Sequence, residues 1–203
     1  MSNPGARRRW LAGLVVAGAL ATGGGAWAQG AAPALSPSQL VATLHHVNQM
    51  EITAGQMAQQ NGAAAAVKDL GRTLVLDHQA ADDQITNYAR AKGMPLMDVP
   101  ANVKNAQQAM QAKLNKLQGM SGSGFDQQFA LDMAQGHTKV LALIDASRST
   151  VRDEGLVVLL DKLEPTLRKH RQLAENILDE NAGAAANTAA RSGMMQGHPG
   201  PAR

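Results

Sequence analysis

Four ionisable residues occupy positions where helical periodicity calls for apolar side chains: Glu51, His78, His137 and His170. His170, for example, lies between Leu167 and Ala174 in a segment whose apolar residues recur at the alternating three- and four-residue spacing of a core-facing helix. Imidazole nitrogens and carboxylate oxygens are suitable ligands for zinc, iron or copper. The four residues are therefore candidate ligands for one transition-metal ion.

The composition indicates which elements carry these residues. Aromatic residues make up only 2% of the 203-residue chain, and no segment alternates apolar and polar residues as a half-buried strand would. We predict an all-α protein with helices over residues 37–60, 64–92, 125–149 and 156–177. The first two helices form a hairpin and the last two form another. The long segment 93–124, with a helical middle at 103–117, crosses between them, an order typical of a four-helix bundle.

Counting residues from each hairpin turn indicates whether the four candidates reach the same level of the bundle. Glu51 and His78 lie about twelve and fifteen residues from a turn near Ala63. His137 and His170 lie about fifteen and eighteen residues from the second turn, at 152–153. At a rise of ~1.5 Å per residue, the members of each pair are offset by only about 5 Å. We therefore expect the four side chains to converge in the core.

A buried Glu/His cluster also fits two classes of protein other than a simple metal binder. Glu51 could accept hydrogen bonds from the imidazoles, with water completing a network that holds no metal. Such a network would suit a structural or interaction protein, because buried polar groups can specify helix register. A metal with an open coordination position could instead make the protein a redox enzyme that acts on peroxide or oxygen. The sequence identifies no reaction and no catalytic residue.

Other polar residues flank the four candidates. His45 and His46 lie beside the apolar stripe of the first helix, and Asp77 and Asp82 flank His78. An aspartate can fix the tautomer of a ligating imidazole by accepting its second N–H. The spacing of Asp77 and Asp82 nevertheless fits solvated helix faces better, so we interpret them as surface residues.

The N-terminal 28 residues are typical of a cleavable export signal. A basic segment containing Arg7, Arg8 and Arg9 precedes an apolar run at 11–21, and a small-residue cleavage site ends at Ala28, before Gln29. The arginines also resemble a twin-arginine motif, so both the general secretory and the twin-arginine routes remain open. The chain has no cysteine for a lipid anchor or a disulfide. We predict a periplasmic or otherwise exported protein.

The remaining chain divides into three parts by composition. Residues 29–35 form a short mobile leader rich in alanine and proline, residues 36–181 form the helical bundle, and residues 182–203 form an Ala- and Gly-rich disordered tail.

Charge and hydropathy limit the partners. The chain has 19 basic side chains, three of them in the predicted signal, so 16 remain against 16 acidic ones. This balance excludes a basic surface for nucleic acid. The apolar run at 11–21 is too short for a permanent membrane span. Peripheral association with the cell envelope remains open, and the sequence does not indicate an oligomeric state.

The segments around the four candidates resemble the family called domain of unknown function 4142. The resemblance lies in NQMEITAGQMA around Glu51, LVLDH ending at His78, FDQQF followed by GH at His137, and LEPTLRKH ending at His170. It covers about residues 35–178. This exported bacterial family is often labelled as an outer membrane protein. The resemblance implies a ferritin-like bundle outside the cytoplasm, with no established activity.

The sequence departs from the di-iron ferritins in its ligand set. Those proteins carry Glu-x-x-His in two helices, but here Val75 and Leu167 stand three residues before His78 and His170. His137 stands where a bridging glutamate would be expected. The carboxylates that bridge two irons are therefore missing, and neither ferroxidase nor iron-storage activity is implied.

Overall fold

The computed structural model describes residues 32, 34–97 and 101–196, including all of their side chains except those of 101–103, 106 and 188–196. This part of the chain contains five α-helices, a short 3-10 helix and no strand, which confirms the predicted all-α class. The elements are α1 (Pro37–Asn61), α2 (Ala65–Lys92), α3 (Ala101–Gln118), α4 (Gly122–Ser147), η1 (Arg148–Thr150) and α5 (Glu154–Gln196). The predicted export signal at 1–28 lies outside the described residues.

The first helical hairpin follows from local sequence signals. α1 begins with Pro37 at its first position and with a capping box, in which Ser36 and Gln39 each accept a hydrogen bond from the other's backbone N–H. Where α1 and α2 cross, a Cβ on Gly55 would lie 2.6 Å from the carbonyl oxygen of Gly71, and the converse distance is 2.7 Å. Because only glycine lacks a Cβ, only glycine permits this close crossing.

The turn between α1 and α2 is held by a residue of α4. The buried Asp126 accepts a 2.9 Å hydrogen bond at each carboxylate oxygen, one from the backbone N–H of Ala63 and one from that of Ala64. Ala64 is the N-cap of α2 and has no side-chain acceptor of its own. Asp126 thus supplies the missing cap and ties the first hairpin to α4.

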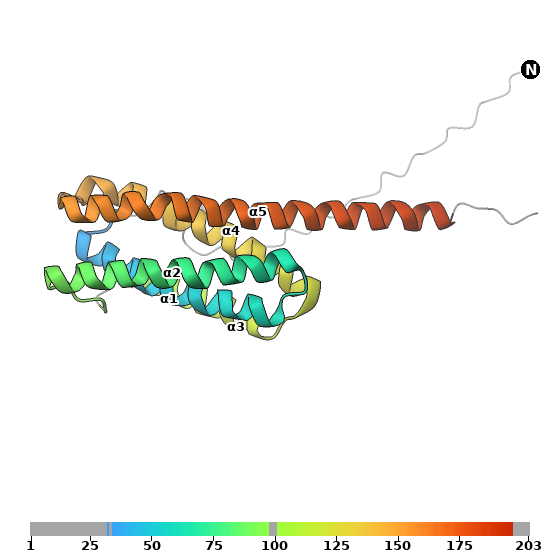
Figure 1. The fold of residues 1–203 in the computed structure, drawn as a ribbon, viewed down its shortest axis with the longest axis horizontal. Coiled ribbons are helices and arrows are strands. Elements are labelled where there is room, and N and C mark those ends of the chain that lie inside the picture. The colour runs from blue at the N-terminus through green and yellow to red at the C-terminus, as the bar shows by residue number, and fades with distance from the viewer. Residues whose placement is uncertain (1–31, 33, 98–100, 197–203) are drawn as a thin grey trace, which may run out of the picture.

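The helices pack around a common core (Figure 1). α1 packs against α2 and α4, and α5 also packs against α2 and α4, so these four helices surround one core. α3 is the helical middle predicted for the long connection, and it packs across α1 and α4 through the buried Leu114 and Leu117. Lys113 of α3 also lies 2.6 Å from the carboxylate of Asp132 on α4, which fixes the connection to the second hairpin.

The core consists of two apolar clusters with a polar layer between them. One cluster includes Leu44, Ile85, Val140 and Leu167, together with the turn between α4 and α5. The other is built from Met50, Leu74, Phe129, Met133 and Ala174, together with the two leucines of α3. In α2, α4 and α5, the residue between the two clusters is a buried histidine: His78, His137 and His170, respectively. The helical register therefore brings the three rings to one level.

The two ends of the described chain differ from the predicted leader and tail. Leu35, the last residue of the predicted leader, is buried, and its backbone N–H donates to Ser147 Oγ at 3.0 Å. α5 continues to Gln196, well beyond the other helices, although we predicted a disordered tail from residue 182 (Figure 1). The side chains of 182–187 are exposed, and the alanines in this part of the helix have a high helix propensity. Among the described residues, no helix is long and apolar enough to cross a membrane.

Candidate metal centre

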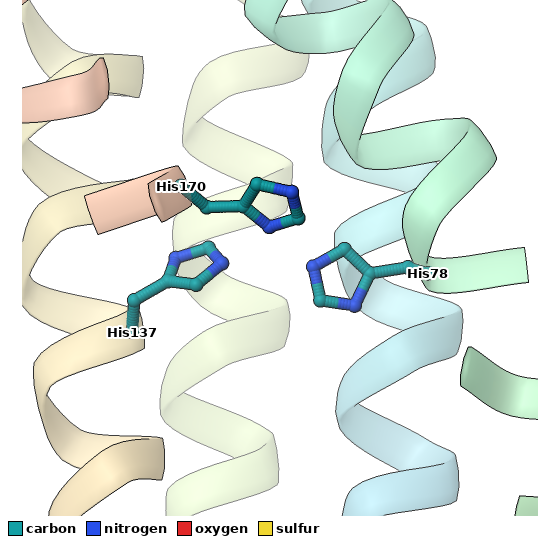
Figure 2. A group of neighbouring side chains, drawn as sticks. All are labelled: His78, His137 and His170. Carbon is teal, nitrogen blue, oxygen red and sulfur yellow. The ribbon is translucent and has the colours of Figure 1, made fainter. Parts of the chain in front are cut away.

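His78, His137 and His170 converge from α2, α4 and α5, with their rings directed toward one another (Figure 2). All three are buried, and one ring nitrogen of each lies within 4.8 Å of those of the other two. The ring centroids are 5.2–5.7 Å apart. Within the described part of the chain, this is the only group of three histidine or acidic side chains that brings its ligand atoms so close together.

Each ring uses its other nitrogen to donate a hydrogen bond to a group outside the cluster. The three bonds run from His78 Nδ1 to Asn48 Oδ1 at 2.8 Å, from His137 Nδ1 to the carbonyl oxygen of Met133 at 2.8 Å, and from His170 Nε2 to Asp77 Oδ2 at 2.9 Å. A main-chain carbonyl or a carboxylate oxygen can only accept, so His137 carries its proton on Nδ1 and His170 on Nε2. For His78 the proton lies on Nδ1 when Asn48 turns Oδ1 toward the ring, an orientation that leaves Asn48 Nδ2 without a partner among the described residues.

The remaining nitrogens are lone-pair acceptors that no protein group satisfies. His78 Nε2, His137 Nε2 and His170 Nδ1 are buried and have no hydrogen-bond partner among the described residues. Leaving a buried acceptor unsatisfied costs about 1–3 kcal/mol, and here three of them share one small region. A metal ion would satisfy all three, because each neutral imidazole offers it one lone pair.

The surroundings keep at least two of the rings neutral. Burial lowers the pKa of His78 well below its usual value, and the neighbouring His137 and His170 lower it further. Burial also lowers the pKa of His170, although its hydrogen bond to Asp77 opposes the shift. Because metals bind the neutral imidazole, these shifts favour the binding-competent form near neutral pH.

The spacing of the rings is compatible with a bound ion. Three imidazole nitrogens about 2.0–2.1 Å from a tetrahedral zinc ion lie about 3.3 Å from one another. Since the observed nitrogens lie within 4.8 Å of one another, the longest gap must close by no more than about 1.5 Å, which small side-chain rotations provide. Zinc, iron and copper all accept such nitrogen donors.

Glu51, the fourth predicted ligand, is buried beside the three histidines but does not join their group. A Cβ on Gly136 would lie 3.6 Å from Glu51 Oε1, so the carboxylate faces α4 next to His137. Its second oxygen has no hydrogen-bond partner among the described residues. Burial raises the pKa of Glu51, while the nearby His137 and Lys113 partly oppose that shift. The four-residue ligand set therefore remains a prediction, with three members brought together.

Two supporting residues were not recognised from the sequence. We interpreted Asp77 as a surface residue, but it accepts the hydrogen bond from His170. Asn48 is the second such residue; it lies one turn after Leu44 and so extends the apolar stripe of α1. Asp82 does not touch the cluster: its carboxylate accepts from His45 at 2.7 Å and from Gln49 at 2.6 Å.

Comparison with known proteins places these residues in a family. The family model described as "Domain of unknown function (DUF4142)" matches residues 24–177 of this chain. The chain belongs to this family. The match includes Glu51, the three histidines and the two residues that orient His78 and His170. No curated protein and no solved structure matches the chain.

The family assignment confirms the resemblance found in the sequence, and its description states no activity. The chemistry of the site must therefore be argued from the side chains. Three buried imidazoles, which lie between two apolar clusters and each place one ring nitrogen within 4.8 Å of the others, could hold a metal ion.

Proposed function

We propose that this protein is an exported, ferritin-like four-helix bundle that binds one transition-metal ion through His78, His137 and His170, with Glu51 as a fourth ligand. The observation that carries the proposal is the pattern of outward hydrogen bonds. Because one nitrogen of every ring lies against an oxygen acceptor outside the cluster, the other nitrogen of each ring is left buried and without a partner among the described residues. Zinc, iron and copper are the candidate ions.

A hydrogen-bonded polar layer without metal is the second candidate, and the raised pKa of Glu51 is the observation that favours it. When protonated, Glu51 could donate one hydrogen bond to one of the imidazoles. A single carboxylic acid carries only one proton, however, so two of the three lone pairs would still lack a protein donor. The polar layer therefore needs water molecules to satisfy the remaining lone pairs, whereas one metal ion would satisfy all three.

The packing supports a four-helix bundle with a long crossover. α1, α2, α5 and α4 form a closed ring of neighbours, and α3 lies in the connection between the two hairpins. Bundles of this kind build metal sites from inward-facing side chains on several helices. The three histidines come from three of the four helices, and Glu51 comes from the remaining one, α1.

The predicted export signal supports a role outside the cytoplasm. Residues 1–28 have the basic segment, apolar run and small-residue cleavage site of an exported protein. We propose that the mature chain acts in the periplasm in metal handling or in the response to envelope stress. Fractionation of cells that express the full chain, followed by N-terminal sequencing, tests this: cleavage after Ala28 is expected, and retention of an uncleaved chain in the cytoplasm would contradict it.

Elemental analysis tests the metal site directly. The full chain is expressed, purified without a histidine tag and analysed for bound metal, and we expect about one ion per chain. His137→Ala should lose this ion, because it removes one of the three ligands and leaves its hydrogen-bond partner, a helix carbonyl, satisfied by the helix itself.

The matched control is His46→Ala, since His46 lies on α1 outside the cluster and the variant should retain the ion. Metal content far below one ion per chain, unchanged by chelation and by reconstitution, would remove the metal proposal. Circular dichroism would establish that the variants are folded, and a folded, metal-free wild type would leave the hydrogen-bonded polar layer.

A further inference from the structure

A pocket of about 150 Å³ opens beside the histidine cluster, between α2 and α5. α1 and α4 contribute to its inner wall through Leu44 and Val140. The pocket has the volume of an engineered protein cavity that holds benzene, so it suits a molecule of about six non-hydrogen atoms. It is therefore too small for a peptide or a nucleotide and large enough for a small organic ligand.

One of the proposed metal ligands, His78, belongs to the wall of the pocket, whereas His137, His170 and Glu51 do not line it. His78 lines the pocket, together with Asn48 and Asp77. Asn48 and Asp77 are the groups that accept hydrogen bonds from His78 and His170, respectively. A molecule in the pocket would consequently contact one of the three rings and the acceptors that orient two of them.

Most of the remaining wall is aliphatic. Leu44, Val47, Ile85, Val140, Leu163 and Leu167 line the pocket. Such a surface binds an alkyl group, because the contact removes apolar area from water.

The charges at the two ends of the pocket favour an anion. Three neutral imidazoles and the Glu51 carboxylate would leave one positive charge on a divalent ion, and the one acidic wall residue, Asp77, already accepts a hydrogen bond from His170. Lys162 on α5 lines the pocket and is exposed, and within the described part of the chain it has no carboxylate partner. It provides a positive charge that attracts an anion toward the pocket.

We propose that this pocket binds a small aliphatic carboxylate, with its carboxylate directed to the metal beside His78 and its alkyl chain against the leucine side chains. The proposal rests on the metal site proposed above. It adds that the metal, held by three histidines and Glu51, takes an exogenous carboxylate as a fifth ligand. Any activity of the protein would then act on a small organic acid or be regulated by one.

Cobalt(II) serves as the probe, because its visible absorption bands respond to the ligands of the ion. The full chain is loaded with cobalt and titrated with butyrate, acetate and the neutral isostere butyramide. Butyrate should shift the bands with saturation and should bind about tenfold more tightly than acetate, because two further methylene groups leave water. Butyramide should leave the bands unchanged, since it carries no charge.

Two alanines of α2 provide a matched pair of variants. Ala80 is exposed and lines the pocket, whereas Ala91 is exposed on the same helix outside it. Ala80→Phe should weaken butyrate binding at least tenfold by filling the pocket, while cobalt binding stays unchanged. The Ala91→Phe variant should bind cobalt and butyrate with the same affinities as the wild type.

The outcomes separate the two proposals. If cobalt binds at one ion per chain but butyrate leaves the bands unchanged, the pocket proposal fails and the metal proposal stands. The pocket proposal also fails if acetate and butyrate bind equally, or if Ala80→Phe binds butyrate like the wild type. If cobalt does not bind, both proposals fail.

Discussion

Replacing His170 by leucine should stabilise the metal-free protein and abolish metal binding. His170 Nδ1 is a buried acceptor without a partner among the described residues, and an unsatisfied atom of this kind costs about 1–3 kcal/mol. The other ring nitrogen donates to Asp77, whose side chain is 38% exposed, so water can replace the lost hydrogen bond. Leucine has a similar volume and suits the apolar neighbours. We expect the free energy of unfolding to rise by about 1–3 kcal/mol in chelator.

Bound zinc should change the difference in unfolding free energy between the wild type and His170→Leu. Zinc at 100 times its dissociation constant stabilises a protein that binds it only when folded by about 2.7 kcal/mol. The wild type should gain this amount, whereas the variant lacks one of three ligands and should gain little. Urea-induced unfolding followed by circular dichroism, in chelator and in excess zinc, measures both differences.

The control is His46→Leu, since His46 lies outside the cluster and its replacement should leave the response to zinc unchanged. Two results would refute the reasoning. A His170→Leu variant at least 1 kcal/mol less stable than the wild type in chelator would show that the ring nitrogen is already satisfied. Equal stabilisation of both proteins by zinc would show that zinc binds elsewhere.

Three further predictions concern the hydrogen-bond acceptor Asp77, the pH dependence of the unfolding free energy, and the crossing of α1 and α2. Asp77→Ala should weaken metal affinity by about 10–100-fold in a competition assay with a chelating dye, because the aspartate orients a ligating ring. The unfolding free energy of the metal-free protein should fall as pH is lowered from 7 to 5, since burial lowers the pKa of His78 and the unfolded chain takes up more protons below pH 6.5. Gly71→Ala should lower the unfolding free energy by about 1–3 kcal/mol, because its Cβ would lie 2.7 Å from a carbonyl oxygen of α1.

Each of these three predictions has its own control variant. Asp83→Ala changes an exposed aspartate of the same helix and should leave metal affinity unchanged. His78→Leu should flatten the fall in stability between pH 7 and 5, and an unaltered slope would show that other groups cause it. A Cβ on Gly183 would meet nothing within 4 Å, so Gly183→Ala should be neutral or slightly stabilising. A Gly71→Ala variant as stable as the wild type would show that the helices separate readily.

The candidate histidines could be found from the sequence because helical periodicity is a local signal. A histidine that replaces leucine at the expected spacing must face the core, and counting from the turns gave the shared level of His78, His137 and His170. The same reasoning placed a helix in the middle of the long connection, where α3 lies.

The supporting contacts could not be found in this way because they depend on the rotation of one helix against another. Asp77 and His170 are 93 residues apart, and whether an aspartate beside the apolar stripe of α2 reaches α5 depends on the packing of the two hairpins. The cap that Asp126 provides for α2 is equally non-local. Glu51 lies on the correct face, but periodicity alone does not define how far a side chain stands from its neighbours.

Anomalous X-ray scattering from crystals of the metal-loaded protein tests the central claim most directly. With data collected at the absorption edge of the bound metal, we expect one strong peak within bonding distance, about 2.0–2.2 Å, of a ring nitrogen of each of His78, His137 and His170. A loaded crystal with no peak at this position, or with its peak beside other residues such as His45 and Asp82, would contradict the claim that the three histidines form a metal site.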